Sequence, residues 1–153
     1  MISINVNKIN ADIRDIINAS AAMREHLVGE ETMIGVAENG KTMIKARAGA
    51  GVDADGAAFA PYTDGYLKQR AKKGRSTRPD LTFTGRMLNN ITTKFIKDGS
   101  ALILFSKSEE ANKAAGNSNK RDFFAIRMAS EITALNKELE RRVTVIAKRL
   151  GLM

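Results

Sequence analysis

The sequence predicts an α+β fold formed as a single domain over residues 1–153. Three observations support this prediction: helical patterns in the N-terminal third, two β-rich runs joined by Asp98-Gly99, and an apolar stripe of helical spacing near the C-terminus. The chain of 153 residues has the length of one domain. A chain of that size can bury about two-thirds of its extended surface, which is enough for a core of its own.

Two helices are expected in the N-terminal third. The first covers residues 8–27, where apolar side chains approximate a 3.6-residue period and Asn7 or Asn10 can cap the start. The apolar positions are Ile9, Ile13, Ile16 or Ile17, Ala21 and Leu27. We expect Gly29 to interrupt this helix.

The second helix is expected over residues 30–48. Its apolar side is formed by Met33, Val36 or Ala37, Met43 or Ile44, and Ala48. Gly35 and Gly40 weaken the prediction of this helix, because each glycine makes the free energy of a helix less favourable by about 1 kcal/mol relative to alanine.

A long loop is expected at about residues 49–80. This segment is rich in glycine and contains both prolines and both tyrosines of the chain, with one helical turn expected around residues 66–72. Most connections within a domain are only ~4–6 residues long. We therefore expect the loop to be functional, disordered until it binds, or ordered by a neighbouring subunit.

A short helix and a β-hairpin follow this loop. Thr84 can cap a short helix in the run GRMLNN. The runs ITTKFIK and SALILFS have high β-propensity, and the intervening Asp98-Gly99 suits a type I′ turn. Residues 108–120 are polar and small, and predict a mobile or interfacial loop.

The C-terminal segment has the strongest periodicity of the chain. Its apolar residues recur at steps of three or four, at Phe124, Met128, Ile132, Leu135, Leu139, Val143, Ile146 and Leu150. Glu138 and Arg142 form an i,i+4 pair, Lys148 and Arg149 suit a helix C-terminus, and Gly151 suits its end. We predict a long helix whose stripe packs into the core.

The residue types argue against catalysis, cofactors and metals. The chain has no cysteine and a single histidine, His26, so cysteine-ligated and multi-histidine metal sites lack their ligands. The turn that begins at Asp53 lacks the later ligands of a calcium loop. Glu109 and Glu110 are adjacent, which gives no preferred acid–base geometry. We expect a protein that is not an enzyme.

No membrane segment is expected. The N-terminal residues lack the apolar run of a signal peptide, and no stretch approaches the ~20 apolar residues of a membrane span. We therefore expect the protein to be made in the cytoplasm, without a membrane partner.

Positive charge is concentrated in the middle of the chain. The formal net charge is +8, and one segment with Asp80 as its only acidic residue contains Lys68, Arg70, Lys72, Lys73, Arg75, Arg78 and Arg86. This segment is either a solvated loop or a contact for nucleic acid or an acidic protein surface. Tyr62 and Tyr66 can stack on bases or anchor a protein interface. No helical stripe accompanies the charges, so we expect no recognition helix and no base specificity.

Three short motifs follow one another along the chain. Gly56, Phe59 and Pro61 fit a G-x-x-[FW]-x-P turn, and Arg121 and Phe123 fit an R-x-F motif before the last helix. An L-x-x-T-G-x-[LM] motif lies between them, at Leu81, Thr84, Gly85 and Met87. With the basic segment and the hairpin, this order resembles the phage virion-morphogenesis or tail-completion family, the small neck proteins that join capsid and tail.

The resemblance implies a structural role in the virion. It implies a homo-oligomeric ring at the head–tail junction, assembled in the host cytoplasm, which contacts other neck, portal-adaptor and tail proteins. The short helix would then orient the hairpin toward a neighbour, and residues 68–86 would meet a neighbouring ring or the packaged DNA. The alternative is a basic nucleic-acid-binding protein that uses residues 68–86 as its footprint.

Overall fold

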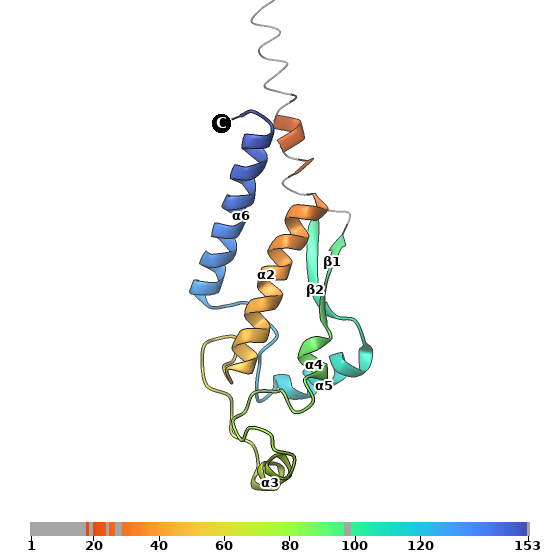
Figure 1. Ribbon diagram of the computed structural model, residues 1–153, viewed down its shortest axis with the longest axis vertical. Coiled ribbons are helices and arrows are strands. Elements are labelled where there is room, and N and C mark those ends of the chain that lie inside the picture. The colour runs from red at the N-terminus through yellow and green to blue at the C-terminus, as the bar shows by residue number, and fades with distance from the viewer. Residues whose placement is uncertain (1–17, 19, 24, 27–28, 97–98, 153) are drawn as a thin grey trace, which may run out of the picture.

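The computed structural model describes residues 18, 20–23, 25–26, 29–96 and 99–152. It confirms an α+β fold with a long C-terminal helix (Figure 1). The elements follow one another as α2 (Glu30–Gly49), α3 (Asp64–Lys72), α4 (Arg86–Asn89), β1 (Ile91–Ile96), β2 (Ser100–Phe105), α5 (Ser108–Ser118) and α6 (Ala129–Arg149). The helix expected over residues 8–27 lies mostly outside the described residues, but the described ones from 20 to 26 are helical.

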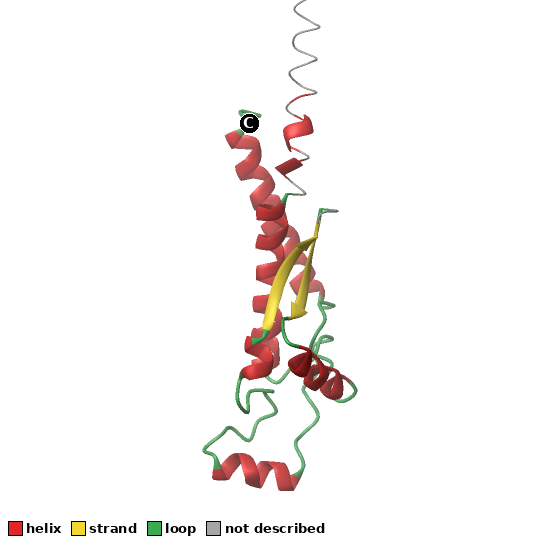
Figure 2. Cartoon of the chain, turned by 90° about the vertical axis from the view of Figure 1, so that its right-hand side faces the viewer, coloured by secondary structure: helices red, strands yellow, loops and turns green. Residues whose placement is uncertain are grey.

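Helix α2 is the central element of the molecule. It contacts both strands on one side and α6 on the other, so the hairpin, α2 and α6 form three successive layers (Figures 1 and 2). Helices α4 and α5 pack together at the base of the hairpin, and α3 lies at the end of the molecule farthest from the C-terminus. The shape is therefore elongated along α2.

The second predicted helix is confirmed. Helix α2 begins directly after Gly29, and its buried side includes Ala37, Ile44 and Ala48. Gly40 is also buried, and a Cβ atom there would lie 2.9 Å from methyl groups of Ile103 and Ile126. Gly40 therefore allows the helix to approach the hairpin closely, which offsets its low helix propensity.

The predicted hairpin is also confirmed. Strands β1 and β2 pair antiparallel from Ile91 opposite Phe105 to Ile96 opposite Ser100. Gly99 has φ +85°, and its N–H donates to the Ile96 carbonyl at 3.1 Å. The pairing of Ile96 with Ser100 leaves three residues between the strands, so the two-residue type I′ turn expected at Asp98-Gly99 was wrong. Lys97 and Asp98 lie outside the described residues.

One buried cluster joins the central helix, the hairpin and the segments around α4 and α5. Its members are Ile44, Ala48, Phe59, Met87, Leu88, Ile91, Ala114 and Phe123. Arg47 of α2 reinforces this junction, since its Nη2 donates to the Phe123 carbonyl at 2.8 Å and its Nη1 pairs with Glu131 of α6. Buried charges of this kind require their partners, because an unpaired charge inside a protein is costly.

The expected mobile loop at residues 108–120 is instead helix α5. Ala111, Ala114 and Ala115 favour the helix intrinsically, and Lys113 pairs with Glu109 at 2.6 Å, one turn earlier. Ala114 and Glu110 are buried against the rest of the chain. The prediction of a loop was wrong: the segment is rich in small polar residues, but its alanines and the i,i+4 spacing of Glu109 and Lys113 favour a helix.

The expected loop at residues 49–80 is also more ordered than its composition predicts. Its residues 64–72 form α3, a longer helix than the single turn expected, and Val52 pairs with Ala58 in an isolated bridge. Ala54, Phe59 and Arg70 are buried. Packing with distant parts of the chain overrides the local glycine content.

The last helix begins later than its stripe suggests. Helix α6 starts at Ala129, so Phe124 and Met128 belong to the irregular segment before it. Its end agrees with expectation: Gly151 has φ +70°, and the N–H groups of Gly151 and Leu152 donate to the carbonyls of Lys148 and Ala147. These two bonds form a Schellman motif.

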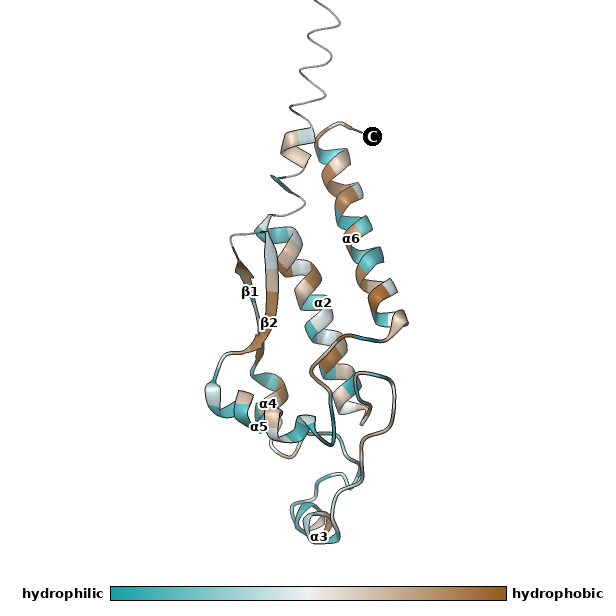
Figure 3. Ribbon diagram, turned by 180° about the vertical axis from the view of Figure 1, so that it is seen from behind, coloured by the Kyte–Doolittle hydropathy of each residue, from teal (hydrophilic) through white to brown (hydrophobic). Residues whose placement is uncertain are grey.

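The prediction that this stripe packs wholly into the core was wrong. Ile146 is buried and Leu135 is half-buried on the side that faces α2, but Ile132 and Leu139 are 45% and 37% exposed. Figure 3 shows apolar residues recurring along α6, which stands apart from the hairpin on the far side of α2. A single neighbouring helix covers only part of such a stripe.

Candidate functional site

The three sequence motifs meet in space. Phe59, Met87 and Phe123, one residue from each motif, are members of the same buried cluster, and Leu81 packs against it. Arg121 donates from Nε and Nη2 to the Ala60 carbonyl at 3.1 and 2.8 Å, and from Nη2 to the Pro61 carbonyl at 3.0 Å. The motif residues therefore hold three distant segments together.

The two motif glycines allow turns that other residues resist. Gly56 has φ +90° in a turn where the Asp53 carboxylate accepts the N–H groups of Asp55 and Ala57 at 3.0 and 2.8 Å. Gly85 has φ +71° and is itself the N-cap of α4. Thr84 was expected to be this cap; it lies one residue before the N-cap, and its hydroxyl accepts the N–H of Arg86, the first helical residue, at 3.4 Å.

Arg70 is not an external contact, contrary to the sequence-based expectation. It is 1% exposed, and its Nη2 donates to Asp80 at 2.9 Å. Its guanidinium group lies 4.9 Å from the ring centroid of Tyr62, and 5.9 Å from those of Tyr66 and Phe83. These contacts stabilise a buried cation by charge pairing and cation–π attraction.

Asp80 is held in its ionised form. Burial alone would raise its pKa, but hydrogen bonds from Thr82 and the charge of Arg70 outweigh burial and leave the pKa below its usual value. The backbone N–H groups of Asp80 and Leu81 donate hydrogen bonds to the Tyr62 hydroxyl, at 3.3 and 3.2 Å. Tyr62 is therefore held in place by contacts within the protein.

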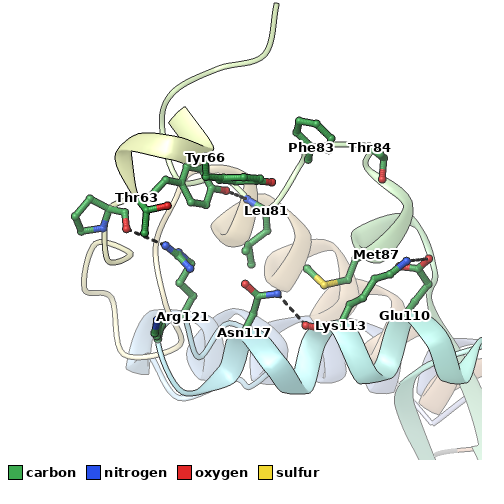
Figure 4. A pocket seen from close by; sticks show the side chains of 13 residues that line it. Thr63, Tyr66, Leu81, Phe83, Thr84, Met87, Glu110, Lys113, Asn117 and Arg121 are labelled. Atoms are coloured by element: carbon green, nitrogen blue, oxygen red, sulfur yellow. Dashed lines mark hydrogen bonds and ion pairs between the residues drawn. The ribbon is translucent and has the colours of Figure 1, made fainter. Parts of the chain in front are cut away.

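An open cavity of about 500 Å³ lies beside this cluster, between α3, the segment 81–87 and α5 (Figure 4). We call it the motif cavity, because five motif residues line it: Pro61, Leu81, Thr84, Met87 and Arg121. The remaining lining residues are Tyr62, Thr63, Tyr66, Phe83, Glu110, Lys113, Asn117 and Lys120. Figure 4 shows the Leu81 and Met87 side chains pointing toward α5.

Helix α5 provides the charged wall of the motif cavity. Glu110 is 5% exposed; its Oε1 accepts from Lys113 at 3.0 Å, whereas its Oε2 is buried and has no hydrogen-bond partner. The hydrogen bonds to Glu109 and then to Glu110 raise the pKa of Lys113. Sequence reasoning missed this wall, although the i,i+4 spacing of Glu109 and Lys113 is a helix signal.

The other predicted contact residues are exposed. Lys68 and Lys72 lie on α3, and Lys73 and Arg75 follow it, at the end of the molecule farthest from the C-terminus (Figure 1). We call these four residues the basic tip. Helix α3 is longer than the single turn expected around residues 66–72, so two of these charges lie on a helix.

Arg78 and Arg86 are exposed outside the basic tip. Arg78 donates to the Gly49 carbonyl at 2.9 Å, and Arg86 is the first residue of α4. The seven predicted contact residues therefore do not form one surface: four are at the tip, two are apart from it, and Arg70 is buried.

The described residues include no group of three or more His, Cys, Asp or Glu side chains able to hold a metal ion. Within the same residues, no helix is long and apolar enough to cross a membrane. No protein-family model matches the chain, and neither curated proteins nor solved structures show significant similarity to it.

Proposed function

We propose that this chain is a structural virion protein of the phage head–tail junction: a neck, connector or tail-completion protein that assembles as a ring and joins capsid or portal to tail. The proposal assigns no enzymatic activity to the chain. Its partners are copies of itself and the other neck, portal-adaptor and tail proteins.

The observation that supports this most is the uncovered part of the α6 stripe. Ile132 and Leu139 are exposed and lie two turns apart on one side of the helix, and the half-buried Val143 follows one turn later. Exposed apolar rows on a folded domain mark interaction surfaces. A ring repeats one interface at every subunit, so a modest contact suffices.

The hairpin offers a second surface for a neighbour. Within the described residues, β1 pairs only with β2, so each strand has one edge without a strand partner. Leu102 on β2 is 48% exposed. Free edges of this kind accept a strand from another chain.

The motifs also support the proposal. The residues that resemble the tail-completion family lie in three segments that are far apart in the sequence, yet they gather around one cluster and one cavity. A chance match of short motifs would not be expected to converge in this way.

The test is the mass of the protein in solution. We expect native mass spectrometry to give a multiple of the 16.7-kDa chain, either for the protein alone or with neighbouring virion proteins added. Ile132→Glu/Leu139→Glu should lower this mass without lowering the melting temperature, because both side chains are already exposed in the subunit. Thr133→Glu/Asn136→Glu is the matched control, since it adds the same charges at exposed polar positions of α6.

A wild-type protein that remains a 16.7-kDa monomer under all these conditions would contradict the proposal. Equal loss of assembly in the control variant would place the interface elsewhere on α6.

The basic tip favours one alternative function, a nucleic-acid-binding protein. Lys68, Lys72, Lys73 and Arg75 are exposed and form no ion pair within the described part of the chain. Binding to the phosphates of a nucleic acid weakens as salt is added. A plot of the logarithm of the binding constant against the logarithm of the salt concentration has a slope of about −0.9 for each phosphate neutralised on duplex DNA. If binding to nucleic acid falls steeply with salt, and if Lys72→Glu/Lys73→Glu makes this salt dependence weaker, the result would favour the nucleic-acid-binding function.

A further inference from the structure

We propose that the motif cavity binds an acidic segment of a partner protein, with one large apolar side chain of that segment packed against Tyr66, Phe83 and Met87. This inference deepens the proposed function by assigning a partner surface, but it does not depend on ring formation. The cavity is formed by α3, the segment 81–87 and α5, and includes no residue of the α6 stripe.

The size and lining of the cavity suit an inserted side chain. Its volume of about 500 Å³ lies within the range of binding pockets, ~300–1,000 Å³. The Tyr66 and Phe83 rings are 5.8 Å apart between centroids, and Leu81 and Met87 continue the apolar surface toward α5 (Figure 4). Aromatic walls and an adaptable methionine are typical of sites that hold an apolar anchor.

The charges at the cavity favour an acidic partner. Lys113, Lys120 and Arg121 line it, against Glu110 as the only acidic lining residue. Lys120 is exposed, and its side chain forms no ion pair among the described residues. The basic tip lies on and just after α3, which forms the opposite wall, so the surroundings are also positive. Complementary charge raises the rate of encounter and selects the partner.

Glu110 favours a protein over a nucleic acid. Its buried Oε2 has no donor, and a buried acceptor without a hydrogen bond is costly. A peptide backbone supplies N–H donors to such a carboxylate. A phosphodiester linkage has only acceptors and offers no donor to this oxygen.

The test is a methyl NMR titration of the full chain with three unlabelled peptides: Glu-Asp-Phe-Asp-Glu, Glu-Asp-Ala-Asp-Glu and Lys-Lys-Phe-Lys-Lys. Methyl signals of Leu81 and Met87 report on the cavity directly, and remain visible in a large assembly. We expect the acidic phenylalanine peptide to shift both signals saturably. The alanine and lysine peptides should bind at least roughly tenfold more weakly, since each lacks one of the two recognition features.

Lys120→Glu should weaken binding of the acidic phenylalanine peptide by roughly fivefold or more. Lys94→Glu is the matched control, because Lys94 is also exposed but lies on β1, outside the cavity. This control should bind as the wild type does. Both variants change only exposed charges, so their melting temperatures should match that of the wild-type protein.

Three results would overturn the proposal. The first is no saturable shift of the Leu81 and Met87 signals with the acidic phenylalanine peptide. The second is equal binding of the alanine peptide, which would indicate charge alone. The third is a saturable shift of the same methyl signals by oligothymidylate but not by the peptide, which would indicate that the cavity binds nucleotides. Native masses of the same samples test ring assembly separately, so the two proposals can fail independently.

Discussion

Arg70 and Asp80 form a buried ion pair that ties α3 to the segment before α4. The Tyr62 and Tyr66 rings are in edge contact, 4.8 Å apart between centroids, and both lie close to the Arg70 guanidinium group. Arg121 also lies over the Tyr62 ring, at 4.8 Å. At the scale of single residues, charges that belong to a basic segment in the sequence thus act as internal supports of the motif cavity.

We expect Asp80→Asn to destabilise the protein by about 3 kcal/mol, because it leaves the Arg70 guanidinium group buried without its counter-ion. Urea denaturation would measure this. Replacing both partners, in Arg70→Met/Asp80→Asn, should recover part of the loss, and Arg75→Gln at the exposed tip should stay within about 0.5 kcal/mol of the wild type. A single variant as stable as the wild type would show that the ion pair contributes nothing.

At the scale of elements, α6 is held by its own charges as well as by α2. The Glu138 carboxylate accepts from Arg141 at 2.8 Å on both of its oxygens, and from Arg142 at 2.7 Å. The hydrogen bond from Arg141 is the largest cause that lowers the pKa of Glu138 from 4.5 to about 2. Arg142 also reaches the Glu31 carbonyl of α2 at 3.3 Å, so this network links the two helices.

The stabilisation by Glu138 should depend on pH. Its pKa is lower in the folded protein than in the unfolded one, so the stabilisation is present above about 4.5 and is lost as the pH falls toward about 2. Thermal melting should therefore find Glu138→Gln less stable than the wild type at pH 6, and this difference should be much smaller at pH 2, near the pKa of Glu138 in the folded protein. Glu140→Gln, on the same helix and without an ion pair in the described residues, is the control. A difference between Glu138→Gln and wild type that persists unchanged at pH 2 would contradict the assignment.

At the scale of the whole molecule, the two surfaces proposed for assembly lie apart. Helix α6 runs along one long side (Figure 2), whereas α3, which carries much of the basic tip and forms one wall of the motif cavity, lies at the end farthest from the C-terminus (Figure 1). Such a separation allows a subunit to contact its copies along its side and a different partner at its end.

Replacing Lys72, Lys73 and Arg75 with glutamate should leave the fold intact, because all three are exposed and exposed charges contribute little to stability. In a phage that depends on this chain, we expect the variant to block head–tail joining, with separate filled heads and tails in electron micrographs. Lys72→Arg/Lys73→Arg/Arg75→Lys keeps the charge and should restore joining. Normal infectious particles from the glutamate variant would show that the tip is only a solvated segment.

The sequence by itself determined the elements whose signals are local. The interruption at Gly29, the hairpin around Gly99 and the end of α6 at Gly151 each depend on backbone conformation and capping within a few residues. The order of the three motifs was also visible in the sequence, and five of their nine residues line the motif cavity.

Only the tertiary structure decided which of these residues face inward. Arg70 is buried because Asp80 and three aromatic rings surround it. The charge pattern of the segment contains Asp80, but it does not show which of the seven basic residues Asp80 pairs with. Ile132 and Leu139 of the α6 stripe are exposed because α2 covers one side only, which periodicity cannot show. Helix α5 likewise forms a wall of the motif cavity because Glu110 and Ala114 are buried against segments that are distant in the sequence. Periodicity and capping are properties of neighbouring residues, whereas burial is a property of whatever the folded chain places against them.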